Sequence, residues 1–148
     1  MMRVDPSFPR LRSVVLDATD ARHLAEFYRQ LLGYRYRVAD EPVDDGGNDP
    51  SHDEFLMLLG PGGSHPLSFQ RVATLAPSTW PSGAIPQQIH LDLSVESRAD
   101  LDVNHRRALD LGARLLEDRA DDPEEPLRVY ADPAGHPFCI FVATSEPQ

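Results

Sequence analysis

The sequence predicts an α+β protein built from two βαβββ modules whose sheets form a shared cleft. One observation is that a strand, a helix and three further strands occur in the same order twice, over residues 13–72 and 89–142. Another is that a proline-rich linker, 73–88, separates the two occurrences. The 148 residues, 41% of them hydrophobic, suit one domain over 1–148 whose two halves share a core. Each sheet is then expected to have one face covered by its helix and one open face, and a concavity between open faces suits a small ligand.

The first module opens with a strand from Ser13 to Ala18, in which apolar and polar residues alternate. A helix is predicted over 20–33 because large apolar side chains recur at helical spacing. Asp20 is placed to cap its first turn, and Gly33 to end it in the left-handed conformation. Further strands are predicted over 34–38, 54–59 and 67–72, and the acidic, Gly- and Pro-containing segment 40–53 is predicted to be a loop.

The second module starts with strict alternation over 88–95, which places His90, Asp92 and Ser94 on one face of a strand. Ser97, followed by Asp100, resembles a capping box at the start of a helix that ends at Gly112. The remaining strands are predicted over 113–117, 127–130 and 138–142, with a turn at 132–135 before the last one.

The composition excludes several classes of chemistry. All 14 basic residues are Arg, and the absence of Lys excludes Schiff-base catalysis and a Walker-type phosphate loop. Cys139 is the only cysteine, which excludes an intrachain disulfide and a thiolate metal cluster. No apolar run approaches the length of a membrane span, and residues 1–9 lack the apolar core of a signal peptide. A cytoplasmic protein with no membrane partner is therefore expected.

The net charge of −10 argues against a nucleic-acid partner, because affinity for nucleic acid comes largely from neutralising phosphates with basic side chains. Thirteen of the 24 acidic residues lie in two predicted loops, 40–54 and 117–125. The acidity thus belongs to the connections and does not predict the charge of a ligand.

Three stretches carry a resemblance to a known family. The predicted helix 20–33 contains Phe27-Tyr28 followed by Leu32-Gly33, the strand 90–95 opens the second module, and 130–137 holds an Asp-Pro-Ala-Gly turn. Together with the doubled βαβββ order they resemble the vicinal oxygen chelate superfamily, which includes glyoxalase I, extradiol dioxygenases, fosfomycin-resistance enzymes and bleomycin-binding proteins. The nearest group is the glyoxalase-like domains. The resemblance covers most of 13–142 and implies a small-molecule ligand in the cleft and a homodimer.

Metal-dependent members of that superfamily hold one divalent ion with ligands from the first and last strand of each module. Carried over by position, those sites are Ser13, Ser68 or Gln70, His90 and Cys139. The usual ligands are His, Gln or Glu, so only His90 matches clearly, with Gln70 as the second candidate. Serine does not replace an imidazole, and a thiolate prefers softer ions than Mg, Mn or Fe.

A different ligand set is chemically reasonable but has no support from the family. Asp17 and Asp92 share strand faces with the carried-over positions, because residues i and i+2 point alike. Together with His90 and Gln70 they would suit Zn or Mn, while Ni and Fe are the other ions to test.

Two further side chains allow more than one interpretation. Trp80, in the linker, could close over a ligand, pack on a neighbouring subunit or cap the core. Cys139 is expected to act as a small buried apolar residue rather than a nucleophile, because no basic neighbour is evident.

Two functional hypotheses remain open, and whether the protein is an enzyme is not decided by the sequence. In the first, the cleft binds a small organic molecule without a conventional metal, through Asp17, Ser68, Gln70, His90, Asp92, Cys139 and Trp80. In the second, the protein is a divalent-metal-dependent lyase, isomerase or dioxygenase acting on adjacent substrate oxygens, with Asp92 as the candidate proton-transfer group.

Overall fold

The computed structural model describes residues 5–43 and 53–143. The first module consists of β1 (Val14–Ala18), α1 (Ala21–Leu32), β2 (Arg35–Tyr36), β3 (Phe55–Leu59) and β4 (Leu67–Arg71), with short 3₁₀ turns η1 (Val38–Asp40) and η3 (Pro61–Gly63). The second consists of β5 (Leu91–Val95), α2 (Arg98–Asp110), β6 (Arg114–Arg119), β7 (Leu127–Ala131) and β8 (Pro137–Val142). None of the helices in these residues is long and apolar enough to cross a membrane.

The two modules have the same sheet topology. Each forms a four-stranded sheet, ordered β1-β4-β3-β2 in the first and β5-β8-β7-β6 in the second. In both, the first strand lies at an edge and runs parallel to the last, while the other neighbours are antiparallel. The α+β class and the two βαβββ modules are therefore confirmed.

Local signals at the helix ends were predicted correctly. The Asp20 carboxylate accepts a hydrogen bond from the His23 amide at 3.0 Å, and Gly33 ends α1 with φ of 68°. Ser97 caps α2 by accepting from the Asp100 amide at 3.1 Å. These contacts satisfy amides and carbonyls that a helix leaves without partners at its ends.

The boundaries differ from the prediction in three places. Strand β2 has only two residues, because the chain turns at η1, where Asp40 accepts from the Met57 amide and pairs with Arg37. Strand β6 continues to Arg119, past a register shift between Leu115 and Glu117. Strand β5 begins only at Leu91. Most of the predicted 40–53 loop lies outside the described residues.

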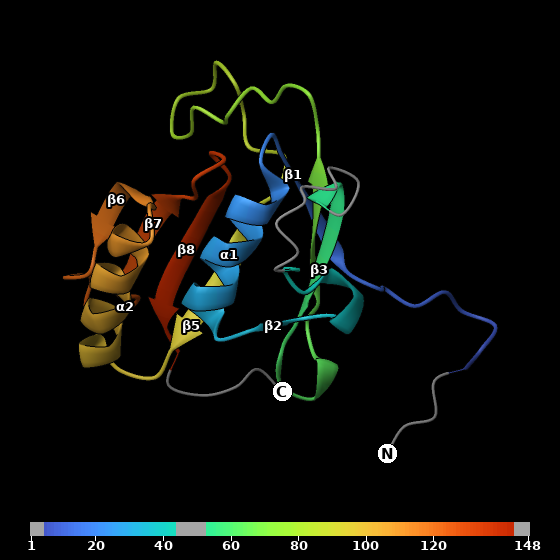
Figure 1. Cartoon of the computed structure of the whole chain (residues 1–148). Coiled ribbons are helices and arrows are strands. Elements are labelled where there is room, and N and C mark those ends of the chain that lie inside the picture. The colour runs from blue at the N-terminus through green and yellow to red at the C-terminus, as the bar shows by residue number, and fades with distance from the viewer. Residues whose placement is uncertain (1–4, 44–52, 144–148) are drawn as a thin grey trace.

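Helix α1 packs between the two sheets (Figure 1). On one side it covers Leu16 of β1 and Phe69 of β4, and on the other its aromatic residues Phe27 and Tyr28 contact Phe138 of β8. Buried side chains of both modules thus form one continuous hydrophobic core.

The position of α1 determines where the open faces lie. Since both sheets turn their apolar faces toward the shared core, α1 leaves the polar face of each sheet uncovered. In the first sheet this open face includes Val15, which is 45% exposed, and Phe55, which is 36% exposed. Between the modules, the start of β1 and the edge strand β5 border a pocket of about 660 Å³ whose lining includes Ser13, Asp92 and Ser94.

A buried polar contact joins α1 to the second module. The Tyr28 hydroxyl donates to Asp132 Oδ2 at 2.7 Å, and Asp132 Oδ1 accepts from the amides of Ala134 and His136. Burial raises the pKa of Asp132, although these hydrogen bonds act in the opposite direction. The predicted 132–135 turn is thus folded around a carboxyl group that Tyr28 reaches from the other module.

Replacing Tyr28 with Phe is expected to lower the free energy of unfolding by about 2 kcal/mol, because the buried Asp132 oxygen loses its donor. Urea denaturation measures the loss. Tyr34→Phe is the matched control, since among the described contacts its hydroxyl has no hydrogen bond, and it should cost less than about 0.5 kcal/mol. Equal effects of the two substitutions would contradict the account.

Candidate functional site

The open face of the second sheet carries most of the candidate residues. One row of neighbouring residues across the four strands consists of Asp92, Cys139, Val129 and Glu117, and the next of Ser94, Phe141, Leu127 and Arg119. The linker adds Trp80 and Gln87 at the edge of this face. Together with His90, most of these side chains line a pocket of about 360 Å³.

Three polar side chains at one edge of this pocket bond to one another. His90 Nε2 lies 3.2 Å from Asp92 Oδ1, and the Cys139 thiol donates to the same oxygen at 2.9 Å. Burial, together with the Asp92 carboxylate, raises the pKa of Cys139 to about 12. The thiol is therefore protonated near neutral pH, which makes it a hydrogen-bond donor rather than a nucleophile.

The sheet surface beside this edge is apolar and aromatic. Phe141, Leu127 and Val129 line it from β7 and β8, and Trp80 adds an indole ring from the linker. Glu117 and Glu125 add carboxylates that form no ion pair within the described part of the chain. Such a combination of aromatic surface and a few polar groups is typical of sites for small organic molecules.

Trp80 is positioned by contacts that fix the linker. Its amide donates to Ser78 Oγ at 3.2 Å, and Thr79 bonds to the backbone of Ile85 on the returning part of the linker. Pro77 packs directly on Gly135 of the turn before β8, where any Cβ would overlap with the proline ring. The linker is thus folded against the second module.

The remaining candidates lie on the first sheet. Ser13 and Ser68 share a hydrogen bond between their hydroxyls at 2.8 Å, and the Gln70 amide donates to the Glu54 carbonyl at 3.3 Å. Asp17 is exposed on the same face. Over the described residues, Asp17 lines a different cavity from His90 and Asp92, and the Gln70 amide bonds to the Glu54 carbonyl.

These residues do not fit the divalent ion held by metal-dependent members of the superfamily. Of the four carried-over positions, two are serines bonded to each other and one is a cysteine, whose thiolate prefers softer ions than Mg, Mn or Fe, so only His90 is of a usual ligand type. Over 5–43 and 53–143, no group of three or more His, Cys, Asp or Glu side chains could hold a metal. Gln70, the second metal candidate, lies on the other sheet with its amide group already bonded.

Several pocket residues were not found from the sequence. Phe141 follows Cys139 by two residues on one strand, so the alternation rule could have found it. Glu117 and Arg119 could not be assigned to this face from the sequence, because the register shift in β6 changes the face on which later residues lie.

Comparison with known proteins agrees with this architecture. A family profile described as a glyoxalase-like domain matches residues 13–141. The chain therefore belongs to the glyoxalase-like domain family, within the vicinal oxygen chelate superfamily. No curated protein matches the sequence significantly.

Solved structures show the same fold at low sequence identity. A glyoxalase/dioxygenase from Nostoc punctiforme superimposes with a TM-score of 0.67 at 15% identity, covering 100% of this chain and 99% of that one. The fosfomycin resistance protein FosX from Mesorhizobium loti superimposes with a TM-score of 0.63 at 15% identity, covering 93% of this chain and 94% of that one. A FosX variant from Listeria monocytogenes, complexed with Mn(II) and 1S,2S-dihydroxypropylphosphonic acid, superimposes with a TM-score of 0.65 at 14% identity. The match covers 93% of this chain and 94% of that one.

Cys139 is expected to react with iodoacetamide at pH 8 at least tenfold more slowly than free cysteine, because its raised pKa leaves little thiolate. Mass spectrometry follows the reaction without ambiguity, since the chain has no other cysteine. Asp92→Asn should accelerate the reaction, because it removes the carboxylate that contributes to the raised pKa. Labelling of the native protein at the rate of free cysteine would contradict the assignment.

Gly135→Ala is expected to destabilise the protein by about 2 kcal/mol, because φ is 96° and the new methyl group would overlap with Pro77. Thermal unfolding measures the loss. Gly83→Ala is the matched control, since a Cβ there meets open space. A Gly135→Ala variant as stable as Gly83→Ala would show that the linker does not pack on this turn.

Proposed function

We propose that the protein binds a small organic molecule on the open face of the second sheet, without a conventional divalent-metal site. The observation that carries the proposal is the pocket in which Trp80 and Phe141 lie beside the edge formed by His90, Asp92 and Cys139. In this edge the thiol donates to the carboxylate, which also lies beside the imidazole, so the edge is suited to orient a ligand by hydrogen bonds.

Each part of the pocket has a distinct role in this proposal. The indole of Trp80 and the ring of Phe141 supply flat apolar surface for a ring-containing ligand. The imidazole of His90 is about half exposed and offers a hydrogen bond at the edge. Ser68 and Gln70 belong to the first sheet and would contribute only if the open face of another chain covers this pocket.

The alternative is a divalent-metal-dependent lyase, isomerase or dioxygenase in which His90 and Asp92 take part. It is favoured by the adjacency of an imidazole and a carboxylate, and by the fold similarity to a FosX protein complexed with Mn(II). At the positions where metal-dependent relatives have ligands, Ser13, Ser68 and Cys139 are not of the usual ligand types, which favours binding without a metal.

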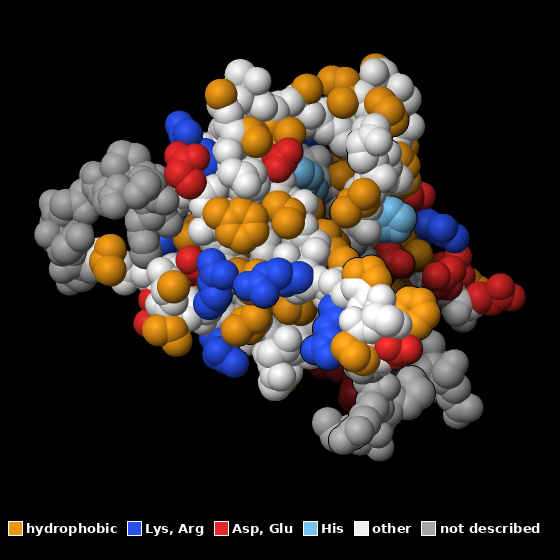
Figure 2. All heavy atoms as spheres, turned by 90° about the vertical axis from the view of Figure 1, so that its right-hand side faces the viewer, with side chains coloured by type: hydrophobic (Ala, Val, Ile, Leu, Met, Phe, Trp, Pro, Cys, Tyr) orange, Lys and Arg blue, Asp and Glu red, His pale blue; other side chains and the backbone are white. Residues whose placement is uncertain are grey.

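We further propose that two chains form a homodimer in which the first sheet of one covers the second sheet of the other. Arg35 lies on the open face of the first sheet, where Figure 2 shows arginine side chains among apolar ones. On the open face of the second sheet, Asp92 and Glu117 outnumber Arg119, and over the described residues Glu117 forms no ion pair. The two faces therefore have complementary charges, and their pairing would form the shared cleft between chains. A cytoplasmic location is part of this proposal, because Cys139 is the only cysteine and the chain therefore has no intrachain disulfide that would suit an oxidising compartment.

Ligand binding can be followed through Trp80, the single tryptophan. The probe is 4-nitrocatechol, an aromatic molecule with adjacent oxygens that absorbs where tryptophan emits. We expect saturable quenching and a Phe141→Ala variant that binds at least fivefold more weakly, since it loses an aromatic contact. Val103→Ala on the exposed side of α2 is the control and should bind as the native protein does. An absence of saturable quenching, or an unaffected Phe141→Ala variant, would overturn the site.

Metal analysis separates the two functional hypotheses. Protein purified without a chelator or an affinity tag is expected to contain no stoichiometric ion and to gain no thermal stability from added Zn, Mn, Ni or Fe. A stoichiometric ion that is lost in a His90→Ala variant would contradict the proposal and support the alternative.

The dimer is tested by exchanging charges across its interface. Arg35→Glu is expected to weaken association in sedimentation equilibrium, because it turns a positive charge on the first face into a negative one against an acidic second face, and adding Glu117→Arg should restore part of it. Arg106→Glu on α2 is the control. A native protein that is monomeric throughout would refute the dimer while leaving the pocket untouched.

A further inference from the structure

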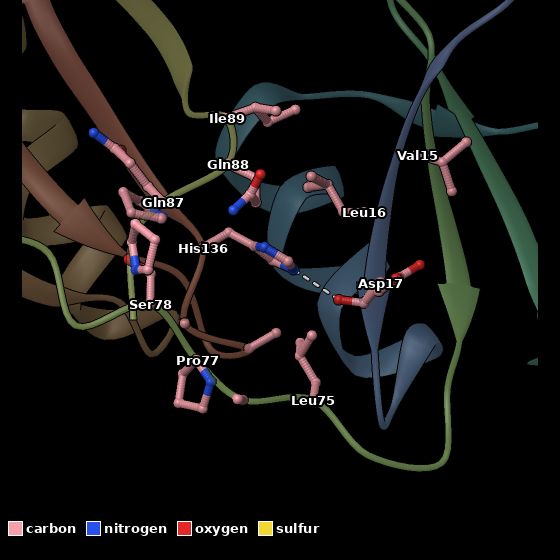
Figure 3. Close-up of a pocket in the computed structure, with 15 residues that line it drawn as sticks. Val15, Leu16, Asp17, Leu75, Pro77, Ser78, Gln87, Gln88, Ile89 and His136 are labelled. Atoms are coloured by element: carbon pink, nitrogen blue, oxygen red, sulfur yellow. Dashed lines mark hydrogen bonds between the residues drawn. The ribbon is translucent and has the colours of Figure 1, made fainter. Parts of the chain in front are cut away.

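A second cavity lies between the modules, beneath the linker (Figure 3). Its walls come from β1, from both ends of the linker at 75–78 and 86–89, and from the turn 134–137. Gln87 and Pro137 also line the neighbouring pocket that contains Trp80, whereas all other lining residues of the two differ. The second cavity is therefore distinct from the proposed functional pocket.

The size and the apolar walls of this cavity suit one ring. Its volume is about 250 Å³, whereas an engineered cavity of about 150 Å³ is sufficient for benzene. Leu16, Leu75 and Ile89 surround it, and two proline rings complete the apolar lining.

The polar groups at this cavity have free hydrogen-bonding capacity. His136 points toward the cavity, and its Nε2 lies 2.7 Å from the Asp17 carbonyl oxygen (Figure 3). Since a carbonyl oxygen only accepts, Nε2 carries a proton, and Nδ1 is the second polar atom of the ring. Over the described residues, the side-chain amides of Gln87 and Gln88 form no hydrogen bond, and each offers a donor and an acceptor.

The lining is also free of opposing charge. Asp17 is the only acidic residue in it and there is no arginine, but the Asp17 carboxylate points away from the cavity (Figure 3). A charged ligand would therefore be desolvated without a counterion, whereas an amide could pair with Nδ1 and the glutamine side chains.

We propose that this cavity binds a small uncharged aromatic or heteroaromatic amide, as a site separate from the one on the second sheet. The bound ring contacts the linker, β1 and the turn before β8 at once, so its binding stabilises the junction of the two modules. This proposal does not depend on the proposed function.

The test uses nicotinamide as the probe and nicotinate, with the same ring and a negative charge, as the matched control. In ¹H–¹⁵N spectra of the full chain, nicotinamide is expected to cause saturable shifts at 15–17, 86–89 and 134–136, with a dissociation constant in the millimolar range. Nicotinate is expected to bind at least fivefold more weakly.

Two variants locate the binding. Gln88→Leu keeps the volume of an exposed side chain but removes its amide, and should weaken nicotinamide binding at least fivefold. Ala76→Trp fills the cavity from an exposed linker position and should abolish binding. Glu117→Gln, in the other pocket, should leave binding unchanged. The proposal is overturned by shifts centred on His90 and Glu117, by equal binding of nicotinate, by an unaffected Gln88→Leu variant, or by the absence of saturable shifts.

Discussion

The buried hydrogen bond from Tyr28 to Asp132 joins the two halves of the molecule at the point where α1 meets the second sheet. It matters because a carboxyl group in this position is costly unless its oxygens have partners. Two amides of the turn before β8 satisfy one oxygen, and Tyr28 of the other module satisfies the second. The turn, the start of β8 and the helix of the first module are therefore fixed relative to one another.

The open face of the second sheet depends on that arrangement. Strand β8 follows the turn directly and carries Cys139 and Phe141, the centre of the pocket. The linker that holds Trp80 packs on the same turn through Pro77 and Gly135. A contact in the core thus determines the relative positions of a thiol, an aromatic wall and an indole on the surface.

The same arrangement explains why one chain has two separate open faces. Aromatic contacts of Phe27 and Tyr28 with Phe138 draw the covered face of the second sheet onto α1. The polar faces are left uncovered by α1, with Arg35 and Asp17 on the first and Asp92, Glu117 and Arg119 on the second. The residues on these open faces, and not the order of the strands, therefore determine what such a fold can bind.

The sequence predicted what depends on local pattern. Helical spacing and end caps predicted α1 with its termini at Asp20 and Gly33, and the alternation of apolar and polar residues predicted the strand order that occurs twice. On the second sheet, alternation placed His90 and Asp92 on one side, and the predicted site residues Trp80 and Cys139 lie beside them. The orientation of the modules could not be predicted, because Tyr28 and Asp132 are 104 residues apart and neither shows a local signal for the contact. The register shift in β6, which brings Arg119 into the pocket, has no signature in the residue pattern.

Native-state hydrogen exchange tests most directly whether the two modules form one cooperative unit. If the shared core holds them together, amides in the centre of β1 and of β8 should exchange with the same free energy of opening, equal to that of global unfolding. Both values should fall by the same amount in the Tyr28→Phe variant. Exchange of one module at a clearly lower free energy than the other, with no change in that difference upon Tyr28→Phe, would contradict the account.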